Sequence, residues 1–150
     1  MPRLFNSSRY TAGYLGLALL LVSTGCDSRP GRKQTYPISG VVYVDGSPAA
    51  NLAVRAHPTA GIDQKDPTVS SAFTDQDGKF TFSTFETGDG IPEGEYKLTF
   101  EWGEMNMLSM QYGGPDKLNS RYKDPETSKS VVKVGPDYPE DLGKIELTTK

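Results

Sequence analysis

Two nearby aspartates are the first side chains in this sequence that could do chemistry. Asp75 and Asp77 belong to the sequence D-Q-D-G, which has the form of an EF-hand loop opening, and Glu86 occupies its twelfth position. Residues 80–83, however, have the alternation of a β-strand, and Asp and Gly also favour tight hairpin turns. We therefore expect a turn and no metal site here, with calcium binding as the alternative.

His57 is the only histidine, and it falls on the polar side of a predicted strand. We expect it to be solvated. A zinc site needs about three or four His, Cys or acidic ligands at set spacings, and this chain has one histidine and one cysteine. It also has no G-x-S-x-G sequence and no glycine-rich phosphate loop. The sequence thus predicts no catalytic residue, no metal and no cofactor.

The segment 102–114 is rich in methionine and aromatic residues. Unbranched thioether side chains provide adaptable apolar surface, which suits a binding site. The candidate binding loop therefore consists of Met105, Met107, Met110 and Tyr112. Two alternatives stay open: the segment covers one end of the domain, or the thioethers bind copper without histidine support.

Cys26 is the only cysteine, so it cannot form an internal disulfide. The chain before it is typical of a secretory signal. Arg3 and Arg9 lie in the polar residues 1–11, and residues 12–22 are a mostly apolar run. A spanning helix takes about 20 apolar residues, and this run is shorter. We expect residues 1–25 to be a signal peptide.

Residues 21–26, LVSTGC, resemble the bacterial lipoprotein signal, in which the cysteine thiol receives a diacylglycerol and becomes the mature N-terminus. Ser23 occupies the position where that family prefers Leu. The resemblance implies an exported chain anchored by lipid at Cys26 and facing the periplasm or exterior; the alternative is ordinary cleavage that leaves a free thiol. The polar residues 26–35 are predicted to be a tether.

From residue 36 onward the hydrophobic pattern has a period of two, and turn residues interrupt it. This pattern predicts an antiparallel β-sandwich. The expected strands are residues 38–44, 52–57, 69–74, 80–83, 95–102, 132–134 and 145–147. Tyr96, Leu98, Phe100 and Trp102 share one face and should form the centre of the core. The long loop before the last two strands could form a short helical turn over residues 115–122.

Three sequence pieces occur in order: residues 37–48, containing ISGVV and DGSP; residues 74–80, TDQDGKF; and residues 92–96, PEGEY. Together they resemble the carboxypeptidase-regulatory-like domain, which is also called transthyretin-like or prealbumin-like. More narrowly, the chain resembles small planctomycete-type lipoproteins, which carry a Y-x-D-P stretch like residues 122–125. The resemblance covers residues 36–148 and implies a seven-stranded sandwich that serves as an accessory or interaction module without catalysis.

The part of the chain from Cys26 onward carries 14 basic and 19 acidic residues, a formal charge of −5. Nucleic acids are bound through Lys and Arg, so this balance argues against them as partners. We expect a membrane-anchored lipoprotein whose domain, residues 36–150, is a non-catalytic binding or structural module of the cell envelope. Its partners would be the membrane and an envelope protein or polysaccharide. The alternative is a small-ligand carrier or enzyme accessory that acts through the 103–127 loop.

Overall fold

The computed structural model describes residues 32–64, 67–106, 108–109 and 111–150. The chain divides into two units, and the second, Lys33–Lys150, contains every described strand. The expected signal peptide, Cys26 and most of the expected tether lie outside the described residues. No helix occurs in the described part of the chain, and therefore none there is long and apolar enough to cross a membrane.

One four-stranded antiparallel sheet has the strand order β11-β8-β4-β5. Its members are β4 (Ala53–Pro58), β5 (Ser70–Phe73), β8 (Gly94–Glu101) and β11 (Val131–Val134). Inward side chains alternate along β8, where Tyr96, Leu98 and Phe100 are buried as predicted. Thr99 is also buried, although the pattern placed it on the outer face.

The second sheet is built around β2 (Ser39–Val44), which pairs with three strands. These are β3 (Ser47–Pro48), β6 (Lys79–Thr81) and β12 (Asp141–Leu147). The β12–β2 pairing is parallel, so the sheet is not purely antiparallel as expected. Its register shifts between Asp141 and Lys144, where Gly143 has a φ of 66°. Such a bulge on an edge strand bends the strand and disrupts further pairing.

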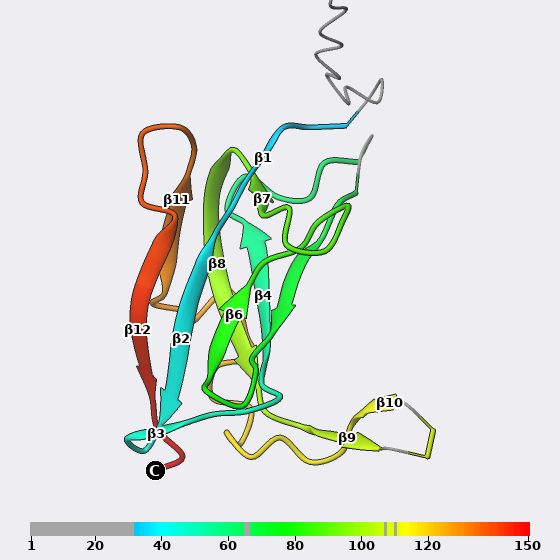
Figure 1. Cartoon of the computed structure of the whole chain (residues 1–150), viewed down its shortest axis with the longest axis vertical. Coiled ribbons are helices and arrows are strands. Elements are labelled where there is room, and N and C mark those ends of the chain that lie inside the picture. The colour runs from blue at the N-terminus through cyan, green and yellow to red at the C-terminus, as the bar shows by residue number, and fades with distance from the viewer. Residues whose placement is uncertain (1–31, 65–66, 107, 110) are drawn as a thin grey trace, which may run out of the picture. The chain divides into compact units, whose positions relative to one another are not determined.

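Four short strands form two small additional sheets. In the first, β1 (Thr35–Tyr36) pairs with β7 (Ile91–Pro92), so the last residue of the expected tether is part of a strand. In the second, β9 (Glu104–Asn106) pairs with β10 (Gln111–Gly113). Figure 1 shows β1 and β7 at one end of the unit and the β9–β10 hairpin projecting near the other.

Side chains of both larger sheets share one hydrophobic core. Val42 and Phe80 enter it from the β2 sheet, and Val54 and Leu98 enter it from the β8 sheet. Figure 1 shows these two sheets as two layers. The alternation of apolar residues fixed which face of each strand turns inward, because a strand exposes successive side chains on opposite faces. The predicted all-β class is confirmed.

Residues 117–122 form consecutive turns, and residues 115–122 contain no helix, unlike the predicted helical turn. Asn119 and Ser120 have φ values of 54° and 58°. These lie in the left-handed region, which interrupts a right-handed helix. The turns nevertheless bury Leu118 completely in the core. Trp102 follows the end of β8 and is only partly buried, where the sequence placed it at the core centre.

Candidate functional site

The candidate binding loop forms the β9–β10 hairpin. Met105 in β9 lies opposite Tyr112 in β10, whereas Met107 and Met110 fall outside the described residues. Within the described part of the chain, β9 and β10 pair only with each other. Of the four predicted residues, the structure therefore brings together the backbones of two, and it leaves the thioether grouping untested.

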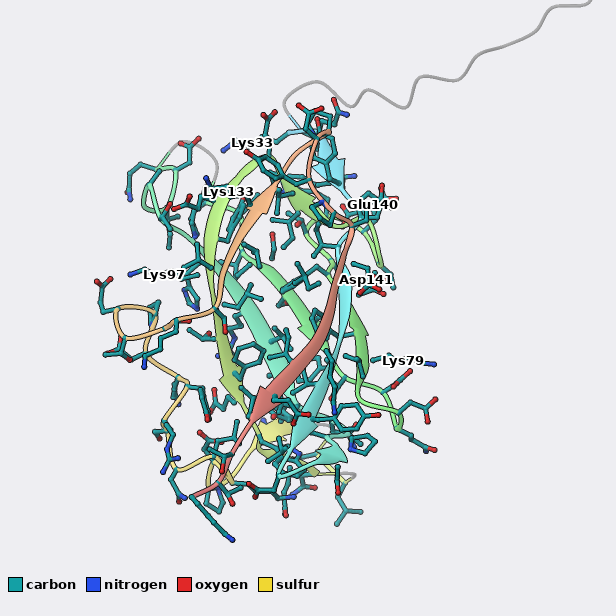
Figure 2. The ribbon with its side chains drawn as sticks, turned by 90° about the vertical axis from the view of Figure 1, so that its left-hand side faces the viewer. Lys33, Lys79, Lys97, Lys133, Glu140 and Asp141 are labelled. Carbon is teal, nitrogen blue, oxygen red and sulfur yellow. The ribbon has the colours of Figure 1, made fainter. Side chains whose placement is uncertain are left out.

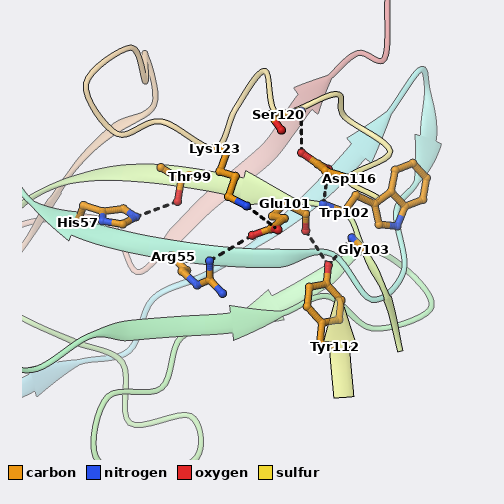
Figure 3. A network of polar contacts seen from close by, with 10 residues as sticks. All are labelled: Arg55, His57, Thr99, Glu101, Trp102, Gly103, Tyr112, Asp116, Ser120 and Lys123. Atoms are coloured by element: carbon orange, nitrogen blue, oxygen red, sulfur yellow. Dashed lines mark hydrogen bonds and ion pairs between the residues drawn. The ribbon is translucent and has the colours of Figure 1, made fainter. Parts of the chain in front are cut away.

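The hydroxyl of Tyr112 connects this hairpin to the end of β8 (Figure 3). It accepts a hydrogen bond from the backbone N–H of Gly103 at 2.6 Å and donates one to the carbonyl oxygen of Glu101 at 2.8 Å. The ring packs edge-on against Phe73, with centroids 5.0 Å apart. Burial raises the pKa of Tyr112. Tyr112 is therefore an anchor for the hairpin base, and its hydroxyl is already committed.

The turn of the hairpin exposes an apolar side chain. Leu108 is 99% exposed. The side-chain oxygen of Asn106 accepts hydrogen bonds from the N–H groups of Leu108 and Ser109, at 3.0 and 3.1 Å. These local hydrogen bonds stabilise the turn in which Leu108 is exposed to solvent.

His57 is partly buried, whereas the sequence predicted a solvated side chain. Its Nε2 lies 2.9 Å from the hydroxyl oxygen of Thr99 on the adjacent strand β8. Burial, followed by the charge of Arg55, lowers the pKa of His57 below its usual 6.5. The imidazole is therefore neutral at pH 7, in a setting that disfavours a second proton.

Three charged side chains, Arg55, Glu101 and Lys123, lie near His57 and Thr99 on the outer face of β4 and β8 (Figure 3). Glu101 forms ion pairs with Arg55 at 3.3 Å and with Lys123 at 3.1 Å. No sequence pattern indicates this cluster, because its members come from β4, β8 and a loop after residue 120. Only the register of the β4–β8 pairing brings Arg55 and Glu101 to the same face.

A cavity of about 570 Å³ opens beside His57, where the loop after β4 approaches β8. Its lining includes apolar side chains of Ile62 and Val69 and the ionisable side chains of His57, Lys97 and Glu126. The sequence does not reveal this cavity, because its lining comes from segments that lie apart in the chain: residues 56–62, 68–69, 95–97 and 125–126. The available signal was Ile62, a large aliphatic residue in an otherwise polar loop.

Asp75 acts in a turn, as expected. Its Oδ1 accepts hydrogen bonds from the N–H groups of Asp77 and Lys79, both at 2.9 Å. Gly78 has a φ of 76°, and a Cβ there would lie 2.4 Å from the carbonyl oxygen of Val42. This close approach of two backbones explains why glycine ends the D-Q-D-G sequence.

Comparison with known proteins does not assign the chain to a family. No protein-family profile and no curated protein matches it. Among solved structures, a 9R-lipoxygenase from Cyanothece PCC8801 aligns at 14% identity and a TM-score of 0.37. That alignment covers 76% of this chain and 16% of the lipoxygenase. So distant a likeness carries no argument about fold or activity.

Proposed function

We propose that this chain is an exported lipoprotein, held to a membrane by lipid on Cys26, whose β-domain is a non-catalytic binding or structural module of the cell envelope. One observation carries the proposal: the lone cysteine directly follows a basic segment, a short apolar run and small residues. A single acyl chain binds a membrane only marginally, so the two or three chains of a lipoprotein anchor would be needed for stable attachment.

We also propose that the domain is a seven-stranded sandwich of the transthyretin-like kind. The seven would be β2, β4, β5, β6, β8, β11 and β12. The remaining strands are two or three residues long and would be additions to it. Support comes from the turn at Gly78, which lies within one of the sequence pieces that carry the resemblance.

Two acidic side chains support a structural use of the domain's polar groups. Asp89 accepts hydrogen bonds from the N–H groups of Thr84, Phe85 and Glu86. Asp116 likewise accepts three backbone hydrogen bonds. Carboxylates used in this way shape loops, and their oxygens are occupied by backbone donors.

Cell fractionation tests the anchor. The wild-type chain should sediment with membranes and require detergent for release, whereas Cys26→Ser should appear in the soluble exported fraction. A Ser28→Ala variant, changed two residues further along, should behave as wild type. Membrane association that survives Cys26→Ser would contradict the proposal.

The second candidate is a small-ligand carrier or enzyme accessory acting through the 103–127 loop, and the fully exposed Leu108 favours it. Under this alternative, envelope extract should raise the melting temperature of the domain, and Leu108→Ser should abolish the increase. Lys79→Met on the other sheet should leave the increase unchanged. An increase that is the same in the Leu108→Ser variant would reject the alternative.

A further inference from the structure

The cavity beside His57 has the size and composition of a small-molecule site. Its volume of about 570 Å³ lies in the range of ligand pockets, about 300–1,000 Å³. Ile62 and Val69 expose 51% and 55% of their surfaces, although both are large aliphatic residues. Both line this cavity, as do Ala56 and Pro58. The domain thus keeps an apolar wall in contact with solvent at this place.

The basic groups of the cavity lie deeper than the acidic ones. The side chain of Lys97 is 30% exposed, whereas that of Glu126, its ion-pair partner at 4.0 Å, is 87% exposed. The other lining carboxylate, Glu95, is 43% exposed and lies 3.8 Å from the ammonium group of Lys133. Lys97 is therefore the least exposed of the three charged side chains that line the cavity. Figure 2 shows Lys97 and Lys133 on the same side of the domain.

His57 adds a second donor. When the Thr99 hydroxyl donates to Nε2, the proton of the neutral imidazole resides on Nδ1 and can be donated to a ligand. Arg55, on the same strand, adds positive charge near the ring. An acidic group that contacts Lys97 here would gain a charge-assisted hydrogen bond, and the Nδ1 proton of His57 would add a second.

We propose that this cavity binds an amphipathic organic anion, whose carboxylate or sulfonate contacts Lys97 and His57 and whose apolar body lies against Ile62 and Val69. The site is separate from the β9–β10 hairpin and does not depend on a lipid at Cys26. Failure of the anchor would therefore leave this proposal intact, and the reverse also holds.

Two matched fluorescent probes test the proposal on residues 26–150 carrying Cys26→Ser, which contain the whole compact unit. The first is 8-anilinonaphthalene-1-sulfonate. The second, N-phenyl-1-naphthylamine, has the same aromatic body without the sulfonate. We expect saturable binding of the anion at about one per chain, and weaker binding of the uncharged probe. Lys97→Met should weaken the binding of the anion about tenfold and the binding of the uncharged probe less than about twofold.

Ile62→Ser should weaken the binding of both probes. The variant should still fold, because the side chain of Ile62 is already half exposed. Lys79→Met, on the other side of the domain in Figure 2, and Leu108→Ser, at the hairpin turn, should change neither. The single histidine provides an independent readout: the imidazole proton resonances of His57 should shift during the anion titration. Binding that does not saturate, that is lost in Leu108→Ser, or that is unchanged in Lys97→Met would overturn the proposal.

Discussion

The carboxylate of Asp116 accepts a hydrogen bond from the backbone N–H of Trp102 at 2.9 Å (Figure 3). The same side chain accepts from the N–H groups of Leu118 at 3.0 Å and Ser120 at 2.9 Å. One carboxylate thereby joins the end of β8 to the turns that insert Leu118 into the core. This relationship gives the long loop a fixed structure without a helix.

Asp116→Ala should therefore destabilise the domain by about 2 kcal/mol, because it removes charged acceptors from partly buried amides. Asp116→Asn should lose less, since one acceptor oxygen remains. The control is Asp124→Ala, whose exposed side chain bonds one amide, that of Glu126. Urea denaturation measures all three. Equal losses for Asp116→Ala and Asp124→Ala would show that the loop does not depend on this carboxylate.

Truncation of two leucines in the same long loop should affect the stability of the domain very differently. Leu118 is fully buried and Leu108 is 99% exposed. Leu118→Ala should cost about 2–4 kcal/mol of unfolding free energy, because it leaves a cavity in the core. Leu108→Ala should change stability by less than about 0.5 kcal/mol. A Leu118→Ala variant as stable as Leu108→Ala in urea would contradict the docking of this loop.

Alternation predicted the all-β class, because it reports which residues of a strand face a core, and that signal is local. The pattern could not show that Leu118 is buried and Leu108 is exposed. The turns that bury Leu118 are held by the Asp116 carboxylate, which bonds to Trp102, 14 residues away in the sequence. The prediction of a helical turn was wrong because Asn119 and Ser120 have left-handed backbone conformations. The i, i+4 spacing of Leu118 and Tyr122 carries no information about φ. The cavity beside His57 depends on strand register, which the turn residues alone did not determine.

Acid should weaken the domain through His57. Its pKa is lower in the folded domain than the usual 6.5, so the unfolded chain binds more protons as the pH falls. Stability should thus decrease between about pH 7.5 and about pH 5.5, and His57→Gln should reduce that decrease. Asp45 responds at lower pH than His57. Hydrogen bonds from Thr149 and Thr148 lower the pKa of the Asp45 carboxyl below 3.8, so its contribution to stability is lost only in stronger acid.

Denaturation midpoints of the wild type and His57→Gln at about pH 7.5 and about pH 5.5 measure the contribution of His57. A proton NMR titration of the single histidine should also give a pKa below 6.5. Equal pH dependence in the two proteins would show that His57 is not responsible.

Removal of the Tyr112 hydroxyl should loosen the base of the β9–β10 hairpin. Tyr112→Phe leaves the Gly103 N–H and the Glu101 carbonyl without this partner, which costs about 1–3 kcal/mol when such groups are partly buried. Hydrogen exchange at the Gly103 amide should accelerate. Tyr138→Phe, at a residue that is 46% exposed, is the control. Unchanged exchange at Gly103 in Tyr112→Phe would reject the anchoring role.

Metabolic labelling with radioactive palmitate tests the lipid anchor most directly. We expect a labelled wild-type chain and an unlabelled Cys26→Ser chain at equal expression. Ser23→Leu, which restores the residue that the lipoprotein signal prefers, should label at least as strongly as the wild type. Label that persists in Cys26→Ser, or a wild-type chain that is exported without label, would contradict the central claim.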